Sequence, residues 1–256
     1  MSAERLPYKQ YMKNKAPARV PRRVLEEWTV ITPAFKAGRF IKECLSSIPD
    51  GVEVLIGLDG CRETLEAVPE RKGLRMFMCE GSSGPYLIRN TLAELAGGKQ
   101  ILFFDADDYL FPDGFADLSV SRAVVTRFPF LDFEDGSSVF KKSKLPCAHG
   151  CFAVDRNYFL STNGFHPWPC ASDTEWKERC DDGRVRILKN PVFARRRHKD
   201  SLTRNSRTGL KTDLRKQYRR IYKTAGKPDK LHTVKYEEIS CVPRKESLTN
   251  CSIVSL

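Results

Sequence analysis

The sequence places three carboxylates within four residues, at Asp105, Asp107 and Asp108. They follow residues 101–104 (ILFF), an apolar run that predicts a buried strand. Clustered carboxylates beside a buried strand are costly without a cation, and their oxygens suit Mg²⁺ or Mn²⁺. Such an ion can bridge two phosphates and neutralise charge on a departing nucleotide diphosphate. The alternative interpretation is an acidic turn that caps the next segment.

Strands and helices alternate around this acidic turn. Apolar runs predict strands over 29–34, 52–58, 74–78 and 101–104, and helical spacing predicts helices over 38–47 and 85–96. This order predicts an α/β fold whose mainly parallel sheet is flanked by helices. Ligands bind beyond the carboxyl ends of the strands in such sheets, so Pro33, Asp59 and Asp105 are expected to converge on one site.

The second half of the chain has less regular patterns. They predict strands over 139–140, 151–154, 184–188 and 191–195 and helices over 155–161, 173–180 and 209–223. Ser172 or Asp173 is expected to cap the helix over 173–180. The last helix is basic and amphipathic, which predicts a helical extension after the main domain.

Four motifs occur in an order that resembles family 2 glycosyltransferases with the GT-A fold. They are a strand ending in Thr32-Pro33-Ala34-Phe35, a strand ending in Asp59-Gly60, a glycine-bearing loop over 81–85 followed by Arg89-Asn90, and the acidic motif over 105–108. The resemblance covers residues 28–115 and implies a GT-A-like, Rossmann-related fold. It also implies a transferase that takes its sugar from a UDP- or GDP-sugar donor.

The resemblance implies a role for individual residues. It implies donor contacts for Thr32, Pro33, Ala34, Asp59, Gly84, Arg89, Asp105 and Ala106. It further implies that Asp107 and His198 hold Mn²⁺ or Mg²⁺.

Weaker motifs of the second half resemble the acceptor half of the same family. They are Asn163-Gly164-Phe165, Ser172-Asp173-Thr174-Glu175 with Arg179 further along the helix, and the segment 197–203, which contains His198. By this resemblance Asp173 is the general base, and one base with in-line attack inverts the anomeric configuration. Arg197, Ser201 and Arg204 are expected to contact the diphosphate or a polyanion. Without the resemblance, Asp173 is explained as a helix cap and His198 as part of a solvated basic run.

Several functions remain open at this point. The first is a metal-assisted glycosyltransferase that acts on the hydroxyl of a glycan, a lipid-linked or a small-molecule acceptor. The second has the same chemistry on a nucleic-acid acceptor with a modified base. The others are a non-catalytic polyanion-binding protein on this scaffold and a nucleotidyltransferase that uses the same acidic cluster.

The net charge of +12 is unevenly distributed along the 256 residues. Residues 1–23 carry +6 and residues 195–230 carry +11, whereas residues 24–194 carry −5. Basic blocks attract polyanions, so the acceptor is expected to be a nucleic acid, an acidic glycan or an anionic lipid surface, although a solvated surface also explains them.

The motifs and the charge blocks together divide the chain into three predicted parts. Residues 1–24 are a flexible basic arm, and residues 25–205 are a GT-A-like catalytic domain, with a nucleotide-sugar-binding half over 25–115 and an acceptor half over 116–205. Residues 206–256 form the basic helical extension and the C-terminal tail. Nine cysteines without a repeating spacing, and no apolar run at the N-terminus, predict reduced thiols and a cytoplasmic protein, peripheral at a membrane or associated with nucleic acid.

Overall fold

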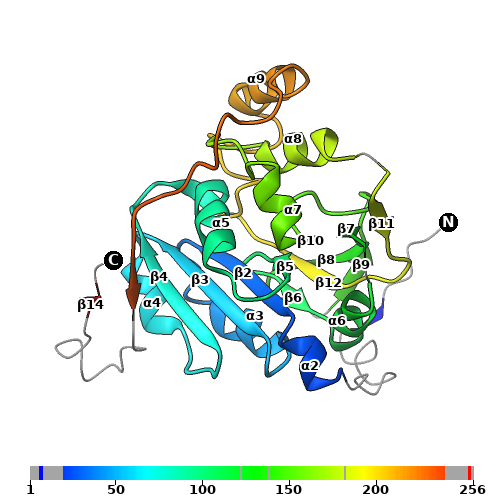
Figure 1. Ribbon diagram of the computed structural model, residues 1–256. Coiled ribbons are helices and arrows are strands. Elements are labelled where there is room, and N and C mark those ends of the chain that lie inside the picture. Colours follow the sequence, from blue (N-terminus) through cyan, green and yellow to red (C-terminus); the bar gives the residue numbers. More distant parts are fainter. Residues whose placement is uncertain are drawn as a thin grey trace.

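The computed structural model describes residues 6–7, 20–121, 123–137, 139–181, 183–239 and 253–254, and shows a mixed α/β fold (Figure 1). Most of the predicted arm over 1–24 and most of the tail after residue 239 lie outside the described residues. Within the described part of the chain, the larger sheet has nine strands and the smaller sheet has five.

Four parallel strands form the centre of the larger sheet. In spatial order they are β5 (Gln100–Phe103), β2 (Trp28–Ala34), β3 (Glu53–Asp59) and β4 (Leu74–Cys79). The helices that connect them are α3 (Ile41–Ser47), α4 (Arg62–Ala67) and α5 (Gly84–Leu95). The predicted parallel strands are thus present, and they are continuously apolar because helices cover both faces of the sheet (Figure 1).

Antiparallel pairing on both sides makes the sheet mixed rather than purely parallel. On one side lie β10 (Phe152–Asp155), β7 (Val125–Arg127) and β11 (Val185–Ile187), and on the other lie β13 (Tyr236–Ile239) and β14 (Ile253–Val254). β10 pairs antiparallel with β5, and β13 pairs antiparallel with β4. β13 lies inside the predicted extension of 206–256, so this part of the extension is a strand of the main sheet, between β4 and β14.

The smaller sheet and the remaining helices come mainly from the second half of the chain. The smaller sheet contains β1 (Leu6–Pro7), β9 (Val139–Lys142), β8 (Phe130–Glu134), β12 (Phe193–Arg197) and β6 (Tyr109–Leu110). The helices are α2 (Arg22–Leu25), α6 (Pro112–Ser119), α7 (Arg156–Ser161), α8 (Ser172–Arg179) and α9 (Asp213–Ile221). The sequence patterns did not predict α4, α6, β7 or β8, and α9 is shorter than the predicted helix over 209–223.

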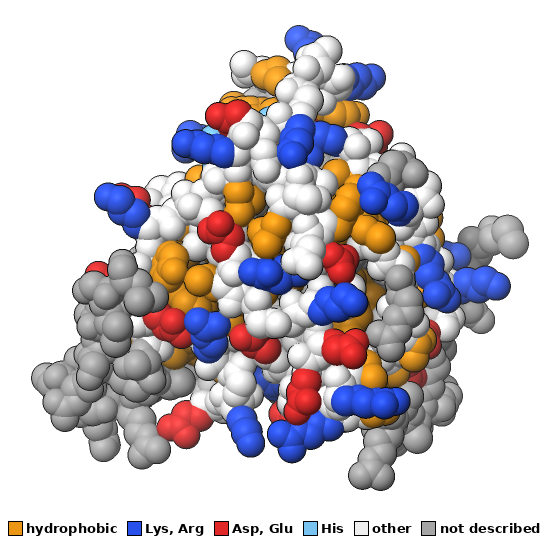
Figure 2. All heavy atoms as spheres, viewed as in Figure 1, with side chains coloured by type: hydrophobic (Ala, Val, Ile, Leu, Met, Phe, Trp, Pro, Cys, Tyr) orange, Lys and Arg blue, Asp and Glu red, His pale blue; other side chains and the backbone are white. Residues whose placement is uncertain are grey.

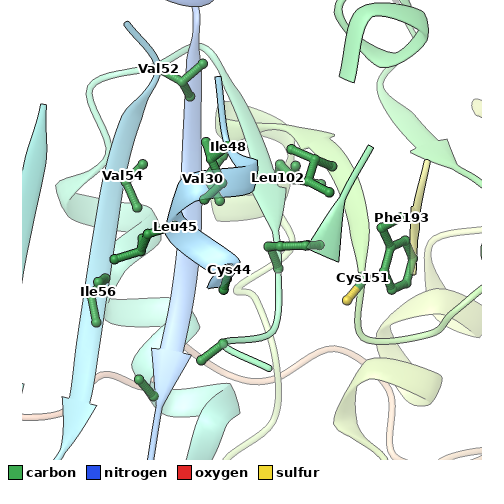
Figure 3. Packing of buried hydrophobic residues seen from close by; sticks show 14 of the residues in the cluster. Val30, Cys44, Leu45, Ile48, Val52, Val54, Ile56, Leu102, Cys151 and Phe193 are labelled. Atoms are coloured by element: carbon green, nitrogen blue, oxygen red, sulfur yellow. The ribbon is translucent and has the colours of Figure 1, made fainter. Parts of the chain in front are cut away.

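Alternating side chains of the central strands supply two hydrophobic layers. Val30 and Ile56 face the layer that α3 completes with Cys44 and Leu45 (Figure 3). The neighbouring residues of the same strands point to the opposite face, where α5 covers them. Burial on both faces fixes the strand register, because a shift by one residue would exchange the two layers.

A glycine in β3 lets α5 lie close to the sheet. A Cβ atom at Gly57 would lie 2.2 Å from Ile88 Cγ2 and 3.2 Å from Leu92 Cδ1, both on α5. Ile88 and Leu92 are completely buried and cannot move aside. The absence of a side chain at Gly57 therefore sets the position of α5, which carries site residues described below.

The described chain has no helix that is both long and apolar enough to cross a lipid bilayer. Its seven cysteines in the described residues are free thiols, and all seven are buried.

We predict that Gly57→Ala lowers the free energy of unfolding by about 1–3 kcal/mol, because the added methyl group overpacks the interface with α5. Gly38→Ala is the matched control, since its Cβ would come no closer than 3.4 Å to Glu63 O, and a change within about 0.5 kcal/mol is expected. Chemical denaturation measures both. Equal stability of the two variants would contradict close packing at Gly57.

Candidate active site

The loops after β3 and β4 meet at the carboxyl edge of the sheet. The two carboxylate oxygens of Asp59 accept hydrogen bonds from the backbone N–H groups of Ser83, at 2.9 Å, and Gly84, at 3.1 Å. A Cβ at Gly60 would lie 2.8 Å from Gly81 Cα, so the two loops touch through glycines. Asp59 thus orders the start of α5 while its side chain remains partly exposed.

The end of β2 lies beside this loop pair. Pro33 is partly exposed, whereas Thr32 and Ala34 are buried. The hydroxyl of Thr32 has no hydrogen-bond partner in the described chain. A ligand at this edge therefore meets Pro33 and the exposed side chain of Phe35 before it meets Thr32 or Ala34.

The acidic turn after β5 is tied to α5 by an ion pair. Arg89, almost fully buried, donates from Nη2 to Asp105 Oδ1 at 2.5 Å. Burial among protein groups raises the pKa of Asp105, while the Arg89 guanidinium opposes this shift. The Asp105 side chain nevertheless keeps 42% of its surface open to solvent, so it can contact a ligand. Ala106 is buried in the hydrophobic layer below.

Asp108 points inward and lies beside a thiol. Burial and the neighbouring Asp107 and Asp105 raise its pKa well above the usual range. Cys151 Sγ lies 3.7 Å from Asp105 Oδ2 and 3.9 Å from Asp108 Oδ2. The ligand atoms of Asp105, Asp108 and Cys151 lie within 4.8 Å of one another, which makes them one group among the described residues that could hold a cation.

Asp107 meets a residue 91 positions further along the chain. His198 Nε2 lies 2.8 Å from Asp107 Oδ2, and the His198 ring packs on Phe40 at a centroid distance of 4.8 Å. The other ring nitrogen, Nδ1, is buried and has no hydrogen-bond partner in the described part of the chain. The structure thus brings the two predicted metal ligands together.

Arg196 connects β12 to the acidic turn. Its backbone N–H donates to Asp108 Oδ1 at 2.9 Å, and its Nε donates to the carbonyl oxygen of Asp107 at 3.0 Å. The rest of the guanidinium pairs with Glu43 and with Asp135, and it lies over the rings of Phe40 and Phe133. This buried cation holds the turn against the smaller sheet.

The neighbouring arginine points the other way. Arg197 pairs with Glu134 at 3.6 Å and with Asp132 at 3.8 Å, and Arg204 also pairs with Glu134, at 3.4 Å. Successive side chains alternate across a strand, so Arg196 faces the acidic turn and Arg197 does not. The Ser201 hydroxyl donates to the carbonyl oxygen of His198. Of the three predicted diphosphate or polyanion contacts, Ser201 is thus the one bonded to a predicted metal ligand.

Asp173 lies in the first turn of α8. Its Oδ1 accepts hydrogen bonds from Tyr86 Oη, at 3.0 Å, and from the backbone N–H of Thr174, at 2.9 Å. The N-cap residue of the helix is Ala171, which has a φ of 69°, and no side chain caps the helix. The predicted cap at Ser172 or Asp173 is therefore wrong. Arg179 pairs with Glu175 and with the carbonyl oxygens of the turn after α7, which gives it a structural role.

The glycine at position 150 brings Asp173 close to the donor half. A Cβ there would lie 3.4 Å from both Asp173 Oδ2 and Arg89 Nη1. Arg89 pairs with Asp105, and Arg89 and Asp173 both border Gly150, so the three side chains lie near one another between α8 and the end of β5. The arrangement offers a carboxylate free to take a proton at one end and a group of potential cation ligands at the other.

Residues 29–118 match the family model for glycosyl transferase family 2. This match confirms the resemblance to family 2 glycosyltransferases, and it spans β2 to α6 with the acidic turn included. A search of curated proteins found no match.

Two solved structures of S. aureus TarS 1-349 share the fold. The complex with UDP-GlcNAc aligns with a TM-score of 0.55 and 16% identity, over 68% of this chain and 60% of that one. The complex with UDP aligns with a TM-score of 0.51 and 17% identity, over 68% of this chain and 61% of that one. This likeness confirms the predicted GT-A-like fold, and this chain matches about three fifths of TarS 1-349.

Sequence reasoning missed three residues of the site. Tyr86 lies three residues before Arg89, so helical spacing places both on one face of α5. Arg196 lies in a run of three arginines, where the alternation of a strand separates the middle one from its neighbours. Cys151 follows directly on Gly150, but its sequence neighbourhood carries no signal for the acidic turn.

We predict that Arg196→Lys lowers the free energy of unfolding by about 2–3 kcal/mol, because lysine cannot keep hydrogen bonds to Glu43, Asp135 and Asp107 at once. Arg197→Lys is the matched control on the other face of β12, with an expected loss below about 1 kcal/mol. Urea denaturation of both variants tests this. A larger loss for Arg197→Lys would contradict the assignment of Arg196.

Proposed function

We propose that the protein is a metal-assisted glycosyltransferase that moves a sugar from a nucleotide-diphosphate sugar to an acceptor hydroxyl with inversion. The observation that carries this proposal is the pairing of Asp107 with His198 beside Asp105, Arg89 and Asp173. Asp107, Asp105 and Arg89 lie within residues 29–118, which match the family model. The same match favours the transferase over the non-catalytic and nucleotidyltransferase alternatives.

The donor lies along the carboxyl edge of the larger sheet. Asp59 binds the base, Asp105 binds the nucleotide, and Thr32, Pro33, Ala34, Gly84, Arg89 and Ala106 shape the surface around it. TarS binds UDP-GlcNAc and UDP on the same fold, which supports a UDP-sugar before a GDP-sugar. Buried Thr32, Ala34 and Ala106 contribute through the backbone, since their side chains point into the core.

The residues around Asp107 fit a divalent cation. Asp107 Oδ2 and His198 Nε2 lie 2.8 Å apart, so these two side chains would hold the ion. The metal-ligand set of carboxylate oxygen and imidazole nitrogen suits Mn²⁺, and Mg²⁺ remains the alternative. An ion held by Asp107 and His198 would supply positive charge against the charge that develops on the departing diphosphate.

Asp173 takes the proton from the acceptor hydroxyl. Its Oδ2 carries no hydrogen bond from the described residues and lies next to Gly150 and Arg89. A carboxylate on the face opposite the leaving group removes the proton as the oxygen attacks the anomeric carbon. Because a single displacement occurs, the anomeric configuration inverts.

Calorimetric titration with a panel of nucleotide diphosphates and nucleotide sugars, with and without Mn²⁺, tests the donor site. We predict that wild type binds one nucleotide in a Mn²⁺-dependent manner, and that Asp107→Ala lowers its affinity at least about tenfold because a metal ligand is lost. Asp50→Ala, which removes an exposed carboxylate elsewhere, is the control and should bind as wild type does. Binding that is independent of metal and of Asp107 would contradict the proposed site.

We also propose that the acceptor is polyanionic. Figure 2 shows Lys and Arg side chains at the end of the molecule that carries α9. Among the described residues, exposed Arg207, Lys211, Arg219 and Lys223 have no carboxylate within salt-bridge distance. Trp168, just before α8, packs on Tyr218 of α9 at a centroid distance of 5.2 Å, so α9 is attached to the acceptor half. Unpaired cations on and near a helix that packs on Trp168 support an acidic acceptor over a neutral one.

Salt-dependent binding of an oligonucleotide, used as a phosphodiester probe, tests this surface. Changing Lys211, Arg219 and Lys223 together to glutamine should weaken binding and lower the slope of log K against log salt by roughly 0.7–0.9 for each cation that contacts a phosphate. The matched control changes the exposed Lys42, Lys72 and Lys99 to glutamine. Equal losses in the two triple variants would show general charge attraction instead.

A further inference from the structure

A tyrosine on α5 makes direct contact with the proposed base. Tyr86, the third residue of α5, is buried, and its ring packs against Phe165 at a centroid distance of 5.6 Å. Its hydroxyl donates to Asp173 Oδ1 at 3.0 Å. The contact joins the donor half to the acceptor half, since Asp173 lies 87 residues further along the chain.

The two oxygens of Asp173 have different surroundings. Oδ1 accepts two hydrogen bonds, from Tyr86 and from the Thr174 N–H, so its lone pairs are occupied. Oδ2 accepts none from the described residues. It faces Gly150, where a Cβ would lie 3.4 Å from Oδ2 and 3.4 Å from Arg89 Nη1. Asp173 Oδ2, the oxygen without a hydrogen bond, thus lies beside Gly150, which has no side chain.

The phenol of Tyr86 is held in its neutral form. Burial and the charge of Asp173 raise the pKa of Tyr86 well above its usual range, although Arg89 and Arg215 oppose the shift. A neutral phenol donates to the carboxylate and does not compete with it for the proton. Tyr86 therefore acts as a hydrogen-bond donor to Asp173, and Asp173 remains the group that can take a proton.

We infer that Tyr86 is a positioning residue for catalysis: by holding Asp173 Oδ1, it leaves Oδ2 as the oxygen that takes the proton of the acceptor hydroxyl. This inference rests on the proposed function. In the step, the O–H bond of the acceptor breaks and its proton goes to Oδ2. The acceptor oxygen bonds to the anomeric carbon, and the bonding pair to the diphosphate oxygen leaves with the nucleoside diphosphate.

A purely structural role for Tyr86 makes a different prediction. If Tyr86 only anchored α8 to α5, its loss would lower stability and disturb donor binding and turnover together. If it acts through Asp173, its loss lowers kcat and leaves the donor KM unchanged, and the effect depends on the presence of Asp173. A double-mutant cycle separates the two roles.

The experiment measures release of nucleoside diphosphate from UDP-GlcNAc with Mn²⁺ and with water as the acceptor, for Tyr86→Phe, Asp173→Asn and the double variant. Asp173→Asn is expected to lower kcat by about 10²-fold or more, because general base catalysis is lost. Tyr86→Phe is expected to lower kcat about tenfold and to keep the donor KM within about twofold, because one hydrogen bond to a charged group is removed. In the double variant, the change at Tyr86 should have no further effect.

Tyr236→Phe is the matched control, because the Tyr236 ring also packs on a phenylalanine, Phe77, and its hydroxyl has no hydrogen bond in the described chain. Thermal unfolding and calorimetric UDP binding confirm that each variant is folded with an intact donor site. If the wild type turns over the donor and Tyr86→Phe has the same kcat, the inference is refuted while the proposed function stands. The same holds if Tyr86→Phe lowers kcat equally with and without Asp173. Failure of the wild type to bind any nucleotide sugar of the panel would refute the proposed function and the inference with it.

Discussion

Compensation of negative charge in the acidic turn is the constraint on which the site depends. Three carboxylates follow a buried strand, and one of them, Asp108, is itself buried. Unpaired charges are costly in such surroundings, so cations must come from elsewhere in the chain. Arg89 supplies one from α5, while β12 supplies the backbone N–H of Arg196, which bonds Asp108, and the nearby charge of Arg195. These partners draw two distant segments to the end of β5.

The parallel strands of the larger sheet bring the loops around the acidic turn together. Parallel β2, β3 and β5 end at one edge, so the loops that follow them meet without long connections. α5 lies close to β3 because Gly57 has no side chain, and its first turns carry both Tyr86 and Arg89. The helix therefore contacts Asp105 through Arg89 and Asp173 through Tyr86, and so joins the proposed donor and acceptor ends of the site. The proposed chemistry relies on this link between the two halves.

The donor half was predictable because its signals are local. Apolar runs, glycine turns and an acidic motif follow one another within 90 residues. The apolar runs mark strands, and the turns and the acidic motif mark where strands end. The second half depends on pairings that the sequence does not encode locally. β13 pairs with β4, which lies more than 150 residues earlier in the chain. The run of three arginines does not indicate that Arg196 is the one that faces the acidic turn. The cap of α8 was missed because Ala171 adopts a positive φ that alanine seldom adopts.

A crystal structure with UDP and Mn²⁺, combined with the anomalous signal of manganese, would locate the nucleotide and the ion together. We predict an anomalous peak in contact with Asp107 and His198 and a nucleotide along the ends of β2, β3 and β5, with its base at Asp59. A nucleotide bound elsewhere on the molecule, with no manganese at the acidic turn, would refute the proposed donor and metal site.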